Sequence, residues 1–384
     1  MHELVAIDLP GGPAFVDALR RAWDQGDAVL PVDQRLAPPG RSALLEAARP
    51  HAVVSATGTA SPVVERTAHA HEAPPVAEGD ALVIATSGTT GAAKLLVHTH
   101  HGLDAHAGAV HAHLDVDPKR DRWLACLPLA HLGGLGVVLR ALRTDTPLDV
   151  LPGFDAAAVA AAPTELGTTL VSLVPTTLDR LDPAPFRWIV LGGSSDGVER
   201  PRNVVHTYGL TETGGGVVYD GVPLAGVDVR IASDGAISLR GPMLARGRRR
   251  PDGEVVAIAA PDGWLATGDL GSWSADGRLQ VDGRADELII TGGENVWPST
   301  VEAALGAHPG VGEVAVVGRP DPTWGQQVVA IVVPADAAAP PTLEDLRAHA
   351  RSLLPAYAAP RRLVLASSLP RTALGKVRRR DLAG

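Results

Sequence analysis

Short apolar runs alternate with helical segments between residues 81 and 191, and this alternation constrains the fold more than any other feature. The runs lie near residues 122–127, 147–151, 168–173 and 187–191. Strands that alternate with helical segments are typical of a sheet with helices packed on its faces. A chain of 384 residues is also too long for one compact core, so we expect two or three domains.

The pattern changes after about residue 215, where short β-runs are separated by turns. The turns are Asp234-Gly235, Asp252-Gly253, Asp262-Gly263 and Asp276-Gly277. Asp-Gly is a frequent turn between antiparallel strands. Residues 215–282 are therefore predicted to form a small antiparallel barrel or sheet.

Residues 284–384 have the pattern of a separate α+β unit. Ser299 and Glu302 have the spacing of a capping box and predict the start of a helix. A second helix is expected to begin at Thr342. The expected strands lie near residues 313–318 and 327–333.

Composition and charge exclude several classes of function. The net charge is −9 without a basic block, which argues against a nucleic-acid partner. No apolar run reaches membrane-spanning length and no signal-peptide pattern is present, so we expect a cytoplasmic protein. The single cysteine, Cys126, excludes an internal disulfide framework and favours a buried thiol. The run Arg246, Arg248, Arg249 and Arg250 is predicted to be a solvated loop.

The strongest local signal is Thr86-Ser87-Gly88-Thr89-Thr90-Gly91-Ala92-Ala93-Lys94, directly after a strand. Glycines and small hydroxyl residues let backbone N–H groups and side-chain oxygens surround a polyphosphate. Only three of the 34 basic residues are lysines, so Lys94 adds an ammonium that this chain rarely uses. Two alanines separate Gly91 from Lys94, unlike a Walker A loop. The segment predicts a phosphate loop of another class, or else a flexible turn.

Four further segments place polar residues on turns. Thr207-Tyr208-Gly209-Leu210-Thr211-Glu212-Thr213 offers a hydroxyl and a carboxylate for a phosphate and Mg²⁺, and Tyr208 for stacking on a base. Asp269, after Thr267-Gly268, can accept hydroxyls of a ribose. Gly292-Gly293, within 283–298, allows close approach of the backbone to a ligand. Pro370–Val377 contains Lys376 after a glycine. Each segment alone is also compatible with a polar turn. A basic solvated tail is the corresponding alternative for Arg378, Arg379 and Arg380.

In this order, the five segments resemble those of the ANL superfamily of adenylate-forming enzymes: acyl-CoA synthetases, peptide-synthetase adenylation domains and luciferases. The resemblance covers about residue 80 to the end. It implies an N-terminal adenylation domain of α/β sheets with a β-rich part, residues 1–283. It also implies a small, mobile α+β lid domain, residues 284–384, with a hinge at Asp286.

The resemblance implies two half-reactions, with ATP, Mg²⁺ and coenzyme A. The acid's carboxylate attacks the α-phosphate of ATP to give acyl-AMP, and the thiol of coenzyme A then attacks acyl-AMP after the lid domain has rotated. The implied catalytic residues are Lys376, Thr211, Glu212 and His131, with Glu212 as the Mg²⁺ ligand. The implied nucleotide contacts are Thr86, Ser87, Gly88, Thr89, Thr90, Gly91, Lys94, Gly192, Gly193, Ser194, Thr207, Tyr208, Gly209, Asp269 and Arg284. The implied substrate and coenzyme A channel residues are Thr213, Gly292, Gly293, Glu294 and Asn295.

Two departures from the superfamily pattern stand out. Ala93 precedes Lys94 where proline is usual, and the chain is short before the phosphate loop. We therefore expect a reduced N-terminal subdomain and a differently walled acyl pocket.

Three stretches resemble the short o-succinylbenzoate–CoA ligases of menaquinone biosynthesis: residues 208–224, 172–176 and 131–135. A pocket for that acid needs an apolar wall and a polar or basic anchor, for which His131 and Thr213 are candidates. Six histidines between residues 98 and 113 lack the spacing of a zinc site, which favours a solvated or nucleotide-side helix.

Three alternatives remain open: another aryl- or fatty-acyl-CoA ligase, a stand-alone adenylation domain that charges a carrier protein, and a nucleotide-binding regulator without catalysis. No basic docking patch for a carrier protein is evident, and every polar position that the chemistry needs is occupied. The expected partners are small molecules, without nucleic acid or membrane. The oligomeric state stays open, a homodimer included.

Overall fold

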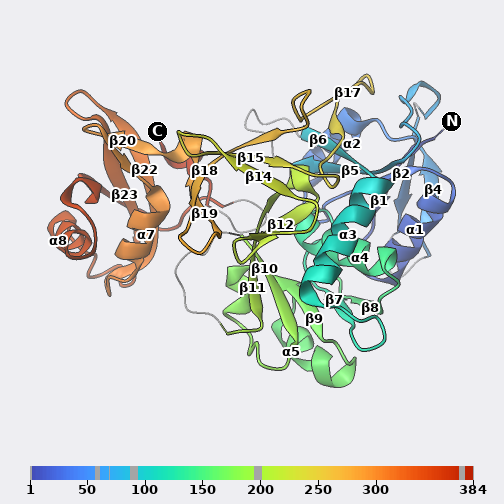
Figure 1. Ribbon diagram of the computed structural model, residues 1–384, viewed down its shortest axis with the longest axis horizontal. Coiled ribbons are helices and arrows are strands. Elements are labelled where there is room, and N and C mark those ends of the chain that lie inside the picture. The colour runs from blue at the N-terminus through green and yellow to red at the C-terminus, as the bar shows by residue number, and fades with distance from the viewer. Residues whose placement is uncertain are drawn as a thin grey trace. The chain divides into compact units, whose positions relative to one another are not determined.

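The chain forms two compact units (Figure 1). The computed structural model describes residues 2–56, 61–68, 70–86, 94–193, 201–371 and 377–383. The first unit comprises Met1–Arg230, Ser238–Thr267 and Ser274–Leu279. The second comprises Ile231–Ile237, Gly268–Trp273 and Gln280–Gly384. The predicted architecture of α/β sheets with a smaller α+β unit is confirmed. The domain boundary after residue 283 and the hinge stay predictions.

The larger sheet of the first unit contains parallel strands with continuous apolar sequences. Strand β1 reads Leu-Val-Ala-Ile-Asp and pairs in parallel with β2 and β3, while β5 pairs antiparallel with β6. Apolar runs of this kind are typical of strands whose two faces are both covered. In sheet order the strands are β17 (Val255–Val256), β16 (Gly247–Arg249), β6 (Lys94–Thr99), β5 (Asp80–Thr86), β2 (Ala28–Pro31), β1 (Leu4–Asp8), β3 (Ala52–Ser55) and β4 (Val63–Arg66).

The second sheet of this unit confirms the four strands predicted between residues 122 and 191. Strands β8, β7, β9, β10 and β11 are parallel, and β12 joins β11 antiparallel. In sheet order they are β13 (Val222–Pro223), β12 (Gly215–Tyr219), β11 (Val204–Leu210), β10 (Trp188–Gly192), β9 (Leu170–Leu173), β7 (Trp123–Ala125) and β8 (Leu148–Val150).

Helices of the first unit pack on these sheets, and Figure 1 shows α3 and α4 side by side. Thr99 caps α3, because its hydroxyl accepts a hydrogen bond from the backbone N–H of Gly102. The helices are α1 (Pro13–Asp24), α2 (Pro38–Ala48), α3 (His100–Leu114), α4 (Leu132–Arg143), α5 (Ala156–Glu165) and α6 (Pro175–Leu178), with short 3-10 helices η1 (Ala70–Glu72) and η2 (Thr211–Thr213).

The β-rich segment 215–282 divides its strands among three sheets instead of closing into one barrel. Strands β12 and β13 extend one large sheet, and β16 and β17 extend the other. The remaining four form a sheet in the order β14 (Asp228–Ile231), β15 (Ala236–Arg240), β18 (Leu265–Trp273) and β19 (Leu279–Arg284).

The arginine run is not the predicted solvated loop, because Arg248 and Arg249 lie on β16, and Arg246 and Arg250 flank that strand. Arg246 makes a two-point ion pair with Asp80, whose side chain is buried, at 2.9 and 2.8 Å. Arg249 is itself buried and donates to the backbone carbonyls of Pro74 and Pro75. The run therefore ties β16 to segments more than 150 residues earlier in the chain.

The second unit is built on a five-stranded sheet with helices α7 and α8 on it, in orange to red in Figure 1. Its strands are β21 (Glu294–Val296), β20 (Ile289–Thr291), β23 (Gly325–Pro334), β22 (Val311–Asp321) and β24 (Arg362–Leu365). Its helices are η3 (Ala285–Glu287), α7 (Pro298–Gly306), α8 (Leu343–Leu353), η4 (Ala356–Ala358) and α9 (Arg380–Ala383).

The two predicted helix starts in this unit have different outcomes. Thr342 caps α8 in a reciprocal capping box with Asp345, as expected. The capping box predicted for Ser299 is wrong, because α7 begins at Pro298 and the Glu302 carboxylate accepts from the backbone N–H of Val316 at 2.7 Å. No helix among the residues described is long and apolar enough to cross a membrane.

Candidate functional site

Strand β11 ends in the Thr207–Thr213 segment at an edge shared with β10. The two strands are parallel, and Gly192 is opposite Thr207. Carboxyl ends of adjacent parallel strands are the usual place for ligands in open α/β sheets. Gly209 follows a bulge against β12, and a Cβ atom there would lie 2.1 Å from the carbonyl oxygen of Gly215. Only glycine fits at this position, which explains the Tyr-Gly sequence.

Glu212 has its backbone fixed and its carboxylate available. Its carbonyl oxygen accepts a hydrogen bond from the N–H of Ala245 at 2.7 Å. No described residue pairs with the part-buried side chains of Glu212 or Thr211. An available carboxylate beside a hydroxyl fits a magnesium ion and a phosphate oxygen, because hard cations prefer oxygen ligands.

The structure corrects the prediction for Thr213, the next residue of this turn. Its side chain is 0% exposed. Its hydroxyl accepts from the N–H of Leu210 and lies 2.7 Å from the carbonyl oxygen of Gly215. The Thr213 hydroxyl therefore stabilises the backbone of the turn, and its buried side chain is not available to contact the substrate.

Buried histidines pack against this turn, which contradicts the solvated alternative for them and is compatible with the nucleotide-side one. His106 on α3 is 3.0 Å from the carbonyl oxygen of Gly216, and burial lowers its pKa to about 3. His98 on β6 lies near the backbone of Thr211, and burial lowers its pKa to about 4. No group of three metal-binding side chains occurs among the described residues, which include all six histidines of this stretch.

The predicted phosphate loop is described only at its two ends. Thr86 ends β5 and Lys94 begins β6, and the two are paired across the antiparallel strands. Ser87, Gly88, Thr89, Thr90 and Gly91 lie outside the described residues. The predicted roles of these residues stay predictions.

The implied nucleotide contacts Gly192, Gly193 and Ser194 begin where β10 ends. The Gly193 carbonyl oxygen is 2.8 Å from Nε2 of His206, and the Thr207 hydroxyl donates to the Leu191 carbonyl oxygen. Gly192 and the predicted base contact Tyr208 therefore lie on neighbouring strands, and Gly193 directly follows β10. Ser194 lies outside the described residues.

The two predicted ribose ligands of the second unit lie together. Arg284 donates to the buried carboxylate of Asp269 at 3.2 Å and is 3.5 Å from Asp286. Burial opposes the charge on Asp286, but Arg380 and Arg284 lower its pKa below the ordinary value. The predicted hinge residue is thus an ionised carboxylate within an ion-pair network.

The Gly292-Gly293 pair forms the turn of the β20–β21 hairpin. Both residues have positive φ, of 62° and 85°, which favours glycine. Glu294 and Asn295 follow on β21 and are exposed. Lys376 lies outside the described residues, and the residues on either side of 372–376, Arg371 and Val377, form a β-bridge.

His131 lies at the start of α4 and pairs with a carboxylate that the sequence did not single out. Its Nε2 is 3.0 Å from Oδ2 of Asp33. Burial lowers the pKa of His131, although Asp33 opposes the shift. Arg35 also binds Asp33 and, with His131, holds the pKa of that carboxyl well below its usual range despite burial.

Sequence reasoning also missed Arg140, at the other end of α4. Its guanidinium is buried, lies 4.7 Å from the ring centre of Trp123 and donates to the Ser172 hydroxyl at 3.0 Å. No described carboxylate pairs with it, and its Nε has no partner among the described residues. A buried arginine without a counter-ion is uncommon and is a candidate anion site. Its apolar neighbours in the sequence could have suggested burial.

Two family models match the chain: AMP-binding enzyme over residues 1–247 and AMP-binding enzyme C-terminal domain over residues 300–376. A Mycobacterium tuberculosis protein named probable 2-succinylbenzoate–CoA ligase is 41% identical over 331 residues, 79% of this chain and 83% of that protein. Sulfoacetate–CoA ligase of Cupriavidus necator is 36% identical over 397 residues, 90% of this chain and 76% of that protein.

Solved structures share the fold over the whole chain. The Bacillus subtilis o-succinylbenzoate coenzyme A synthetase in complex with ATP and magnesium ion has a TM-score of 0.83 and 25% identity, covering 100% of this chain and 89% of that chain. Wild-type E. coli MenE with a bound analogue has a TM-score of 0.75 and 27% identity, covering 100% and 87%.

Proposed function

Because the chain belongs to the AMP-binding enzyme family, we propose that it is an ATP-dependent carboxylate–CoA ligase that acts on o-succinylbenzoate. The similarity to the mycobacterial relative, over most of both chains, carries the choice of acid. The products are the acyl-CoA thioester, AMP and diphosphate. This reaction provides an activated acid for menaquinone biosynthesis, and ATP and coenzyme A place the enzyme in the cytoplasm.

In the first half-reaction an oxygen of the acid's carboxylate bonds to the α-phosphorus of ATP, and the bond to diphosphate breaks. Thr211 contacts the α-phosphate, and Lys94 with the loop before it holds the other phosphates. The available Glu212 carboxylate would hold Mg²⁺, which would neutralise charge on the phosphate oxygens. The Lys376 ammonium stabilises the charge that builds up between the carboxylate and the phosphate.

In the second half-reaction the thiol of coenzyme A attacks the acyl carbon, and AMP leaves. The second unit rotates about Asp286, which exchanges Lys376 for the Gly292–Asn295 hairpin turn. The bare glycine backbone of that turn lines the channel for the pantetheine arm.

Arg140 supports an acid with a second anionic group. o-Succinylbenzoate keeps a free carboxylate on its ring after the succinyl carboxylate has been activated. A guanidinium binds such a carboxylate through two parallel hydrogen bonds. We therefore assign Arg140 as the anchor of the ring carboxylate, with His131 at the start of the same helix near the acyl chain.

Sulfoacetate is the second candidate substrate, because the relative named for it matches more of this chain. It also carries a second anion, a sulfonate, but has no aromatic ring. A pocket for sulfoacetate is therefore smaller and needs no apolar wall for a ring.

The test is release of AMP and formation of a thioester, measured with ATP, Mg²⁺, coenzyme A and one acid at a time. We expect turnover with o-succinylbenzoate and much less with benzoate, a fatty acid or sulfoacetate. Turnover with sulfoacetate but not with o-succinylbenzoate would transfer the proposal to the second candidate. AMP release without consumption of coenzyme A would favour a carrier-charging adenylation domain.

Lys376→Ala separates the two half-reactions. Loss of one charge-stabilising group slows such a step about 100-fold or more. We expect that loss for acyl-AMP formation, while thioester formation from supplied acyl-AMP largely survives. Equal loss in both steps contradicts the assigned role.

A further inference from the structure

The chain that follows Lys376 is attached to its own unit by several described contacts. Arg371 and Val377 form a β-bridge, and the N–H of Arg378 donates to the Pro370 carbonyl oxygen at 2.8 Å. Arg371 also pairs with Glu313 on β22 at 2.7 Å. The two ends that flank residues 372–376 are therefore held together and fixed to the sheet.

Arg379, three residues after Lys376, is the most firmly held side chain of this tail. Its Nε and Nη2 donate to the two carboxylate oxygens of Glu302 at 3.1 and 2.6 Å, and its Nη1 donates to Glu287 at 2.9 Å. Its side chain is only 19% exposed. The same Glu302 oxygen that meets Nε also accepts from the N–H of Val316. One guanidinium thus joins α7, η3 and β22.

The neighbouring arginines differ in their environment. Arg380 pairs with Asp286, the predicted hinge residue, at 2.6 Å, but that arginine side chain is 60% exposed. Arg378 is exposed and has one weak described partner, Asp381, at 3.5 Å. Exposed pairs contribute little to positioning, whereas a two-point guanidinium–carboxylate contact fixes direction as well as distance. Burial works against the charge of Arg379, yet Glu302 and Glu287 raise its pKa above the ordinary value.

We propose that Arg379 is a positioning residue for the adenylation half-reaction. Its contacts with Glu302 and Glu287 fix the chain three residues beyond Lys376, so that the ammonium meets the developing charge at the α-phosphate. The inference rests on the proposed function, because the role of Lys376 does. A misplacement of about 1 Å at a reacting centre lowers a rate about 100-fold. Loss of the Arg379 contacts therefore slows acyl-AMP formation, which needs Lys376, and leaves thioester formation unchanged.

The test compares Arg379→Gln with the matched control Arg378→Gln, each measured in both half-reactions. For Arg379→Gln we expect acyl-AMP formation to fall about 10- to 100-fold. Thioester formation from supplied acyl-AMP is expected to stay within about 2-fold, because it does not use Lys376. Arg378→Gln, which removes only an exposed pair, is expected to leave both rates unchanged. An equal fall in both steps for Arg379→Gln would show a general structural defect and overturn the proposal.

A double-mutant cycle with Lys376→Ala tests whether Arg379 acts through the lysine. Adding Arg379→Gln to Lys376→Ala is expected to cause no further loss of acyl-AMP formation, because the group being positioned is already absent. An additional 10-fold loss in that background would overturn the proposal. Wild-type turnover and the effect of Lys376→Ala are measured first. Absence of turnover, or an equal loss in both half-reactions for Lys376→Ala, would count against the proposed function itself and not against the role of Arg379.

Glu287→Gln covers the case in which Arg379→Gln does not fold. It removes one charged partner on η3 and leaves both contacts with Glu302 in place. We expect a smaller loss, about 3- to 10-fold, again confined to acyl-AMP formation. If Arg379→Gln does not fold, unchanged acyl-AMP formation in a folded Glu287→Gln protein would overturn the proposal.

Discussion

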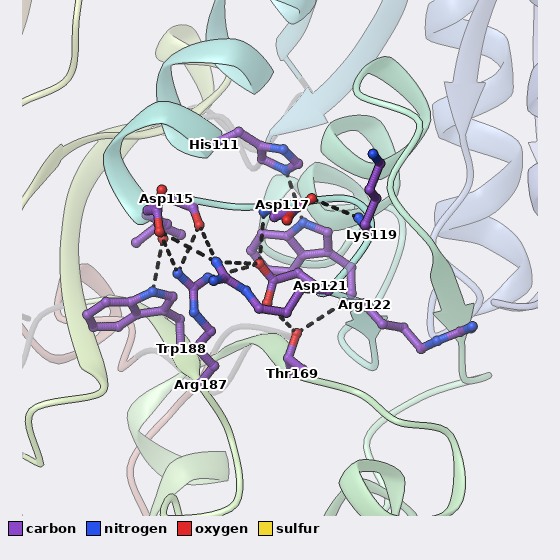
Figure 2. Close-up of polar contacts among 12 residues, drawn as sticks. His111, Asp115, Asp117, Lys119, Asp121, Arg122, Thr169, Arg187 and Trp188 are labelled. Atoms are coloured by element: carbon purple, nitrogen blue, oxygen red, sulfur yellow. Dashed lines mark hydrogen bonds and ion pairs between the residues drawn. The ribbon is translucent and has the colours of Figure 1, made fainter.

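Asp121 is the centre of a polar cluster in the first unit, and its removal gives a strong prediction (Figure 2). Its side chain is 0% exposed. It accepts hydrogen bonds from Arg187 at 2.9 Å, from the Thr169 hydroxyl at 3.0 Å and from the backbone N–H of Asp117 at 2.9 Å. These partners lie in the turn after α3, directly before β9 and directly before β10. One carboxylate therefore connects three segments of the fold.

The expected loss for Asp121→Ala follows from these contacts. Removing one member of a buried ion pair costs about 3–5 kcal/mol, and a buried N–H left without a partner adds about 1–3 kcal/mol. Arg187 is 27% exposed and keeps its contacts with Asp115, so solvent and Asp115 recover part of this loss. We therefore expect about 4 kcal/mol for the alanine variant. Asp121→Asn keeps one accepting oxygen, loses the charge and replaces the other oxygen with an NH2 group, and we expect about 1.5 kcal/mol for it.

Differential scanning calorimetry of the whole chain measures both variants. The transition of the first unit is expected to shift down by about 8 °C for Asp121→Ala, with that of the second unit unchanged. Asp117→Asn is the control, because an asparagine there can still accept from the N–H of Lys119 in an exposed turn. An alanine variant within about 1 kcal/mol of wild type would refute the reasoning.

Two further predictions follow from buried groups and from backbone geometry. Burial lowers the pKa of His111 to about 4, so between pH 7 and pH 5 the unfolded chain binds a proton at this residue that the native chain does not. The contribution of His111 to stability therefore falls by about 2 kcal/mol over this range. In urea titrations His111→Gln should lose about 2 kcal/mol less than wild type, while the losses from His98 and His106 remain. Gly292→Ala should destabilise the second unit more than Gly293→Ala in thermal unfolding, because both positions have positive φ but only at Gly292 would Cβ lie 2.7 Å from the Trp324 ring.

The sequence predicted the strands of the first unit well where both faces of a strand are buried, because such strands consist of continuous apolar residues. Strands β7, β9 and β10 are parallel and buried on both faces, so their apolar sequences stand out from the surrounding segments. Strand β16 gave no such signal, because its arginines are satisfied by carbonyls and a carboxylate far away in the chain. Analysis of the neighbouring sequence alone therefore predicts that these arginines are solvated.

The candidate site divides in the same way. Gly209 and the Gly292-Gly293 turn could be identified because their backbone geometry demands glycine locally. The buried state of His98 and His106 could not, because nothing in a run of histidines tells which face the next sheet covers. Asp33 and Arg140 were missed for the same reason.

Two local interpretations in the second unit fail for a single reason. The sequence predicts that Glu302 caps its own helix and is compatible with Arg379 in a basic solvated tail, and each interpretation satisfies the group locally. The structure pairs the two side chains across 77 positions of sequence. The half-buried Arg379 loses more hydration than an exposed arginine would, so its segment packs only because the Glu302 carboxylate on α7 accepts its hydrogen bonds. A charged group with an acceptable local explanation can therefore still be the one that a distant segment depends on, and in this chain that segment begins directly after Lys376.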